Sequence, residues 1–454
     1  MRSLRKWVLP AFVALLLPHS LQARQTAAFE VPDLPIDTFT LANGLSVVVS
    51  EDHSTPVVAV NMWYRVGSAH EEPGRSGFAH LFEHMLFEET ENLADGEMDQ
   101  LVSRAGGIYN GTTNTDRTAY FEVLPSNRVN LAFWLHAERM ARLRVSAENF
   151  ENQREIVKEE RRLRVDNQPY AGAQLAVDTL AQRDFEPYRH TVIGSMADLD
   201  AATVEDVQDF YRRYYAPNHA VLAVVGDVTV AQVRALAEET FGSIPRGPEI
   251  PPLPEPPSIP RSDGERRADV EAPLAQLPLL WMAFNLPPAD HPDHHALTLL
   301  SQIFSTGESS RLRERLVDQE QAALDVIALV DRRLGPGMML FGALPNQGVD
   351  IATLEWLIEA EIERLQVEGV TQRELAKARN QVRTAAVSQR SSVQSKATLL
   401  QAAALFYGSP HQVNEELDHV EAVTAADLMR VAQTYLIPEN RTVVVARPSR
   451  PAGD

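Results

Sequence analysis

The sequence of 454 residues contains no cysteine. This absence excludes disulfide bonds, thiol catalysis and a lipid-modified N-terminal cysteine, and it leaves only nitrogen and oxygen ligands for any metal site. Basic residues are also few, because 42 Lys and Arg residues stand against 62 Asp and Glu residues, a formal net charge of −20. Such a balance argues against nucleic acid as a partner and mildly favours basic peptides.

Long apolar runs are lacking beyond the first residues. The chain starts with a basic stretch that contains Arg2, Arg5 and Lys6, continues with apolar residues 7–17, and reaches the small residue Ala23. This pattern predicts a signal peptide over residues 1–23. No later segment is long and uncharged enough for a transmembrane helix. We therefore expect a mature chain without a membrane span that is exported, to the periplasm if the source is Gram-negative.

Residues 77–87 (GFAHLFEHMLF) carry the most informative motif. In a helix, His80 and His84 lie one turn apart on the same face, with Glu83 beside them. Two neutral imidazoles fill two positions on tetrahedral Zn²⁺, a third protein ligand fills another, and water takes the fourth. A carboxylate next to the zinc-bound water can act as general base in peptide hydrolysis. The spacing of His80, Glu83 and His84 is the H-x-x-E-H pattern of zinc peptidases.

The alternative is an ordinary pair of surface histidines. It fits poorly, because the residues around the motif are apolar and would bury the polar side chains at a high free-energy cost. A third ligand is expected on the charged segment 149–166 (NFENQREIVKEERRLRVD), which is predicted to be helical. Glu155, Glu159 and Glu160 are all available there, and spacing alone does not choose among them.

The chain contains an internal repeat. The segment from Thr203 to Pro217 aligns with the segment from Thr424 to Pro438 at a constant offset of 221 residues (424 minus 203), and an apolar strand follows each copy. A proline-rich stretch lies between the two copies. We therefore predict an α+β fold with two homologous domains, each a mainly antiparallel sheet with helices packed on one face. The predicted boundaries are a signal peptide at 1–23, a metal-binding domain at 24–243, a linker at 244–267, and a domain without the metal motif at 268–454.

Two local patterns give further expectations. The dipeptide Asn43-Gly44 between apolar runs predicts a hairpin with a type I′ turn. The cluster Asp290-His291-Pro292-Asp293-His294-His295 has the composition of a metal site but lacks suitable spacing. We interpret it as the start of a helix, with Asp293 as the N-cap and His294 as the first helical residue.

The motif and the chain as a whole resemble the pitrilysin/insulinase family of zinc peptidases, in the branch that includes mitochondrial processing peptidase. This resemblance implies Zn²⁺ as the cofactor and selects Glu160, which lies 76 residues after His84, as the third ligand in Val157-Lys158-Glu159-Glu160. Many relatives carry another glutamate seven residues before that ligand. This chain has Gln153 there, which we interpret as the loss of a carboxylate that tunes the site.

The resemblance also assigns a substrate-binding strand. Residues 108–123, taken alone, read as an ordinary exposed strand pair. In relatives, the stretch that resembles Asn110, Gly111, Thr112 and Thr113 is an edge strand beside the zinc, to which peptide substrates add as an extra strand. Gly111 stands where relatives often have alanine.

The resemblance finally predicts a partner. In active single-chain relatives, the second half supplies an arginine and, seven residues later, a tyrosine that reach the substrate. The corresponding positions here are Val317 and Leu324, and neither side chain can donate a hydrogen bond. We therefore expect a zinc endopeptidase subunit, with Glu83 as general base, that acts on peptides or unfolded segments in a heterodimer with a homologous subunit that supplies the Arg and Tyr. The alternatives are a non-catalytic scaffold subunit and a peptide-binding or chaperone module.

Overall fold

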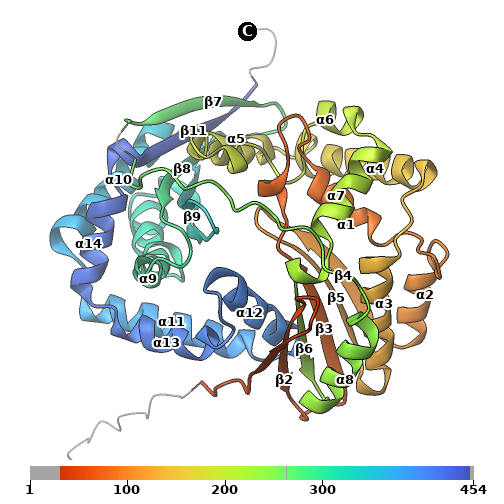
Figure 1. The fold of residues 1–454 in the computed structure, drawn as a ribbon. Coiled ribbons are helices and arrows are strands. Elements are labelled where there is room, and N and C mark those ends of the chain that lie inside the picture. The colour runs from red at the N-terminus through yellow and green to blue at the C-terminus, as the bar shows by residue number, and fades with distance from the viewer. Residues whose placement is uncertain (1–30, 262, 450–454) are drawn as a thin grey trace, which may run out of the picture. The chain divides into compact units, whose positions relative to one another are not determined.

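The computed structural model describes residues 31–261 and 263–449 (Figure 1). The predicted signal peptide, residues 1–23, lies outside these residues. From Asp33 onward the described residues form one compact unit. None of the helices that the structure describes is both long and apolar enough to cross a membrane.

The first half of the chain forms a six-stranded sheet with the order β1-β2-β6-β3-β5-β4. Its strands are β1 (Asp37–Thr40), β2 (Ser46–Glu51), β3 (Val57–Tyr64), β4 (Ile108–Thr113), β5 (Thr118–Pro125) and β6 (Ala220–Gly226). Only β2 and β6 pair in parallel, and all other neighbours are antiparallel. Because β4 is the last strand, it is an edge strand, as the resemblance implied.

Eight α-helices accompany this sheet in the described residues of the first half. They are α1 (Phe78–Met85), α2 (Glu97–Arg104), α3 (Val129–Ala141), α4 (Ala147–Arg161), α5 (Ala171–Ala181), α6 (Met196–Ala201), α7 (Val204–Tyr214) and α8 (Val230–Phe241). A π-helical turn, Arg162–Asp166, continues α4. Side chains of α1, α3, α7 and α8 bury one face of the sheet in a single apolar core.

The second half repeats this plan. Its sheet has the order β7-β11-β8-β10-β9, formed by β7 (Arg266–Ala272), β8 (Leu279–Leu286), β9 (Ala323–Asp331), β10 (Gly337–Pro345) and β11 (Arg441–Pro448). Only β7 and β11 pair in parallel. Its α-helices are α9 (Asp293–Ser305), α10 (Ile351–Glu368), α11 (Gln372–Gln389), α12 (Val393–Phe406), α13 (Gln412–Ala422) and α14 (Ala425–Tyr435). The order and directions match β2-β6-β3-β5-β4, which confirms the prediction of two similar halves and the α+β fold class.

The sequence repeat has a direct structural counterpart. Thr203 caps α7 and Thr424 caps α14, each through the same capping box with an aspartate three residues later. Each helix leads through a proline-started 3-10 turn into an interior strand of its sheet, β6 or β11. The predicted domain boundaries at 24–243 and 268–454 remain predictions. Between the two halves, the described residues 242–261 and 263–265 contain no helix or strand.

The expectation that helices cover one face of each sheet is wrong. The second face of the first sheet packs against α12 from the second half, and the second face of the other sheet packs against α5 from the first half. The central strand β6 is buried at every position. Its continuous apolar sequence, without polar alternation, is the pattern of a strand buried on both faces.

Two local expectations also require correction. The hairpin between β1 and β2 is present, but Gly44 alone in this turn has a positive φ, of 95°, whereas a type I′ turn needs two such residues. Asn43 instead turns its side-chain amide to the carbonyls of Phe241 and Ile244. Helix α9 begins at Asp293 rather than after it, and Asp293 accepts hydrogen bonds from Arg430 and Tyr435 instead of capping the helix.

Candidate metal centre

Helix α1 is fixed by packing of its apolar side chains and by hydrogen bonds at its N-terminus. Its apolar residues, among them Phe82, are buried, and the Phe82 ring packs on that of Tyr215 with centroids 4.2 Å apart. The N-terminus has no capping side chain of its own, because Gly77 precedes it. Glu71 replaces the cap, since its carboxylate accepts hydrogen bonds from the backbone N–H groups of Gly77 and Ala79 at 2.9 and 2.7 Å. The negative charge also complements the positive end of the helix dipole.

The three predicted metal ligands converge. His80 and His84 lie one turn apart on α1, and Glu160 lies in the last turn of α4, which packs against α1. The Oε2 atom of Glu160 is 3.2 Å from Nε2 of His84 and 3.8 Å from Nε2 of His80. Among the described residues, this is the only group of three His, Asp or Glu side chains whose ligand atoms could hold one metal ion.

These distances fit zinc. Two ligand atoms at roughly 2.0–2.1 Å from a tetrahedral ion lie about 3.4 Å apart, close to both measured separations. Burial lowers the pKa of His80 to about 4, so its imidazole stays neutral and able to bind a metal at neutral pH. The hydrogen bond with His84 lowers the pKa of Glu160, which keeps that carboxyl ionised. The donor set of two imidazoles and one carboxylate therefore suits Zn²⁺.

Glu83 lies between the two histidines in sequence and faces the same cavity. Its Oε2 atom accepts a hydrogen bond of 2.5 Å from the hydroxyl of Thr113 on β4. Burial raises the pKa of Glu83. Since a higher pKa makes a carboxylate a stronger base, the environment suits a group that accepts a proton.

The residues predicted from the motifs and the resemblance line one cavity of about 400 Å³. Its lining consists of His80, Glu83, His84, Phe87, Asn110, Gly111, Thr112, Thr113, Glu160 and Arg164. The strand β4 thus lies directly beside the ligand cluster. Gly111 is tightly confined, because a Cβ atom there would lie 3.0 Å from the Phe87 ring and 3.1 Å from Cγ of Glu83.

The hydrogen-bond pattern of β4 leaves backbone groups at the open edge. The N–H of Asn114 donates to the carbonyl of Arg117 at the hairpin end, so Asn114 faces β5. Every second residue of a strand faces the same neighbour, so the N–H and C=O groups of Thr112 also point toward β5. Those of Gly111 and Thr113 point toward the open edge. The outward N–H of Gly111 donates to its neighbour Asn110 Oδ1 at 2.8 Å. An added strand must displace this side chain.

Sequence reasoning missed several supporting residues. Arg164 pairs with Oε1 of Glu160 at 2.8 Å, and the spacing of four residues on a helix could have revealed it. Arg117 donates to the carbonyl of Thr112 at 2.6 Å and stacks over the Trp63 ring. No sequence signal pointed to Glu71, whose role depends on the path of a loop.

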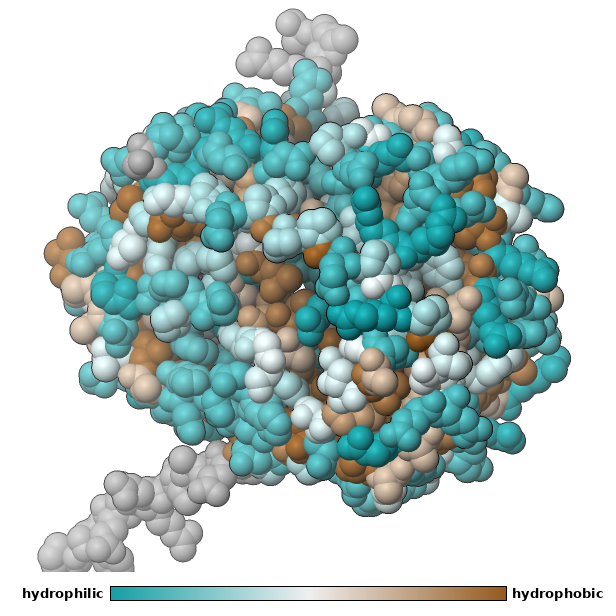
Figure 2. Space-filling view, in the orientation of Figure 1, coloured by the Kyte–Doolittle hydropathy of each residue, from teal (hydrophilic) through white to brown (hydrophobic). Residues whose placement is uncertain are grey.

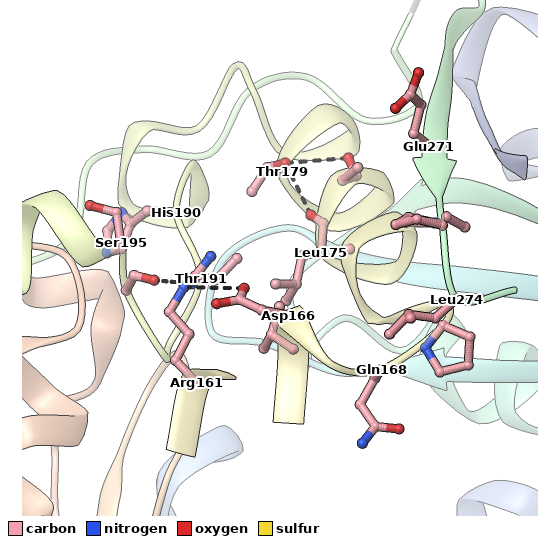
Figure 3. A pocket seen from close by; sticks show the side chains of 18 of the residues that line it. Arg161, Asp166, Gln168, Leu175, Thr179, His190, Thr191, Ser195, Glu271 and Leu274 are labelled. Atoms are coloured by element: carbon pink, nitrogen blue, oxygen red, sulfur yellow. Dashed lines mark hydrogen bonds and ion pairs between the residues drawn. The ribbon is translucent and has the colours of Figure 1, made fainter. Parts of the chain in front are cut away.

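A second cavity, of about 480 Å³, is lined by residues from the end of α4 and from α5 (Figure 3). Arg161 and Asp166 line it next to α5, and Leu274 lies on the opposite side. It contains one histidine, His190, which is paired with Glu71 at 2.9 Å. This cavity lacks the ligand set of a metal centre.

The fold and the donor set define a protein with two similar sheets and a metal centre suited to Zn²⁺, and comparison with known proteins specifies its family. The model described as insulinase (peptidase family M16) matches residues 46–187, and the one described as peptidase M16 inactive domain matches residues 201–382. Zinc protease PqqE of Helicobacter pylori is 33% identical, over 91% of this chain and 93% of its own length. A probable mitochondrial-processing peptidase subunit beta of Arabidopsis thaliana is 24% identical, over 96% of this chain and 82% of its own length.

The fold agrees with a solved relative. The crystal structure of a protease from Helicobacter pylori superimposes with a TM-score of 0.85 at 31% identity, covering 91% of this chain and 100% of that one. The chain belongs to the insulinase family of peptidases, M16, which confirms the resemblance drawn from its motifs. Zinc is the cofactor of this family, which includes the zinc protease PqqE named above.

Proposed function

We propose that this chain is the zinc-bearing subunit of an endopeptidase that hydrolyses peptides or unfolded protein segments. The observation that carries the proposal is the convergence of His80, His84 and Glu160 on a cavity that also holds Glu83. When bound, zinc supplies a Lewis acid that polarises the scissile carbonyl and acidifies water.

Glu83 acts as the general base in this proposal. Thr113 occupies its Oε2 atom, which leaves Oε1 to accept a proton from the attacking water. The carboxyl then returns this proton to the leaving amine nitrogen as the peptide bond breaks. Its raised pKa makes Glu83 a stronger base for the first transfer than an exposed glutamate.

The substrate binds as an added strand along β4. Support comes from the edge position of β4 and from the outward N–H and C=O groups of Gly111 and Thr113. Such pairing grips any extended backbone and selects little among side chains. It therefore suits a peptidase for unfolded segments.

The decisive experiment compares wild type with Glu83→Gln for metal content and peptide cleavage. We expect about one zinc per chain in both proteins and hydrolysis only in wild type, because the substitution removes the base and leaves the ligands. Glu91→Gln, at an exposed position, is the control and should keep full activity. Zinc without hydrolysis in wild type, even with a partner, favours the scaffold or peptide-binding alternatives.

A homologous partner completes the site in this proposal. Val317 lies half-buried in the π-helical segment Arg313–Gln319, and Leu324 lies on β9 with 51% of its surface exposed. Figure 2 shows apolar side chains gathered where Figure 1 draws β9, and Ile327 and Leu329 on that strand are also exposed. None of these side chains can donate a hydrogen bond to a developing oxyanion, and losing such a donor costs about 10²–10³ in rate.

Peptidase activity of the lone chain against that of a co-expressed pair tests this requirement. The expected partner is a homologous subunit that lacks H-x-x-E-H and carries the Arg and Tyr, and a search of the neighbouring reading frames for such a subunit is the first check. We expect strong activity only from the pair. The double variant Val317→Arg/Leu324→Tyr should raise the activity of the lone chain, whereas full activity of the unmodified lone chain would refute partner dependence.

Export is part of the proposal. Its support is the composition of residues 1–23, namely the basic start, the apolar stretch and Ala23. Cell fractionation with N-terminal sequencing of the mature protein tests it. An unprocessed N-terminus in the cytoplasmic fraction would contradict it.

A further inference from the structure

A chain of side chains extends from His84 away from the cavity. The Nδ1 atom of His84 lies 3.3 Å from Oε1 of Gln153, and Nε2 of Gln153 donates to Oε1 of Glu88 at 2.5 Å. Gln153 is buried on α4, two helical turns before Glu160 and on the same face. Glu88 follows α1 by three residues. The three side chains come from two separate parts of the sequence.

The chemistry of these groups fixes the direction of both hydrogen bonds. An ionised carboxylate only accepts hydrogen bonds, so Glu88 must face the NH₂ group of Gln153. The amide oxygen of Gln153 then faces His84 and can only accept, so Nδ1 of His84 must carry the proton. The Nε2 atom, which faces Oε2 of Glu160 at 3.2 Å, is then the ring nitrogen that is left to bind a metal ion.

We infer that Gln153 and Glu88 are positioning residues that set the tautomer of His84 for metal binding. The inference rests on the proposed metal site. The family resemblance implies a glutamate at the position of Gln153, and Glu88 supplies a carboxylate one side chain further from the histidine. The amide transmits the orientation that a directly bonded carboxylate would impose.

His80 provides an internal contrast. Its Nδ1 atom is buried and has no hydrogen-bond partner among the described residues. The two hydrogen bonds that link His84, Gln153 and Glu88, here called the relay, therefore act on one ligand of the pair. Removal of the relay should affect His84 while leaving His80 unchanged.

The first test uses metal-free protein with ¹⁵N-labelled histidine, because nitrogen chemical shifts distinguish the two tautomers directly. In wild type we expect His84 to be protonated at Nδ1. Gln153→Leu removes the acceptor and Glu88→Leu frees the amide to rotate, so both should shift the His84 proton from Nδ1 toward Nε2, which faces Glu160, and leave His80 unchanged. The exposed substitution Gln372→Leu is the control. An unchanged His84 tautomer in Gln153→Leu would overturn the inference.

The second test measures zinc affinity by competition with a chelator. Gln153→Leu and Glu88→Leu should each weaken binding about 10–100-fold, the usual effect of losing such a partner. The exchange variant Gln153→Glu/Glu88→Gln keeps one carboxylate and one amide in contact, and it should restore affinity to about the wild-type level. Failure of the exchange to rescue, with both proteins folded, would also contradict the relay.

The two hypotheses fail separately. If wild type binds no zinc, the proposed function fails, while the tautomer measurement still tests the relay without metal. If wild type binds zinc and both leucine variants bind it equally well, the metal site stands and the relay is wrong.

Discussion

Thr113 donates its hydroxyl proton to Oε2 of Glu83 over 2.5 Å. The strand that we propose to bind substrate therefore also orients the carboxylate that we propose as general base. Substrate pairing along β4 and the position of Glu83 are consequently coupled through one side chain.

The first prediction tests this contact. Thr113→Val keeps the side-chain shape and removes the donor, so kcat should fall about tenfold, equivalent to one hydrogen bond of about 1–1.5 kcal/mol. Zinc content should not change, because Thr113 contacts no ligand. Thr113→Ser, which restores a hydroxyl, should recover most of the activity in the same peptide assay. Equal kcat for the Val and Ser variants would show that the hydroxyl does not orient the base.

The second prediction concerns the N-terminus of α1. Glu71→Gln leaves one acceptor oxygen for the two backbone N–H groups of Gly77 and Ala79, so one of them loses its partner. We expect a loss of about 1–3 kcal/mol in the free energy of unfolding together with weaker zinc binding. The neighbouring Glu72→Gln, at an exposed position, is the matched control. Thermal unfolding and chelator competition measure both effects, and identical behaviour of the two variants would contradict the capping role.

The third prediction concerns Asn110. Its side chain occupies the N–H of Gly111 that an added strand needs. Asn110→Ala frees this donor, and KM for an extended peptide should fall by about 2–10-fold, the value of about 0.5–1.5 kcal/mol for one hydrogen bond. Asn110→Asp retains an acceptor oxygen and should keep the wild-type KM. An increase in KM for the alanine variant would mean that Asn110 itself binds the substrate.

The fourth prediction concerns pH and the contact between the halves. Lys396 on α12 pairs with Asp52, directly after β2, and this hydrogen bond lowers the pKa of Asp52 to about 2. Because the folded pKa lies below the unfolded value, the stabilisation is present above about pH 4 and is lost as the pH falls through about 2. Asp52→Asn should therefore be less stable than wild type by on the order of 1 kcal/mol at pH 6.

Denaturant unfolding at several pH values measures this difference. The gap between wild type and Asp52→Asn should shrink as the pH approaches 2, while Asp37→Asn, at an exposed position of β1, should match wild type throughout. A gap that stays constant down to pH 2 would exclude the ion pair as its source.

Much of the fold was predictable because its signals are local. Thr203 and Thr424 begin equivalent helices through the same capping box, so the repeat could be recognised from short segments. The turn at Asn43 was predicted wrongly for the opposite reason. Its side chain bonds to the carbonyls of Phe241 and Ile244, about 200 residues away, and this tertiary contact decides the conformation of the turn.

The exchange of helices between the sheets was also beyond local signals. Helices α5 and α12 are rich in alanine and leucine, and nothing in their sequences identifies which sheet each one covers. The buried strand β6 indicated that some element covers its second face. Only the folded chain shows that this element is α12.

The sequence by itself determined the pair of histidines, because a period of 3.6 residues places positions four apart on one face of any helix. It also predicted Glu83 as the general base and, through family resemblance, Glu160 as the third ligand. The tertiary structure alone decided which further groups contact these side chains and helix α1. Glu71, Thr113, Gln153 and Glu88 reach the site through loop paths and helix packing, and such contacts depend on distances between segments that no local periodicity encodes.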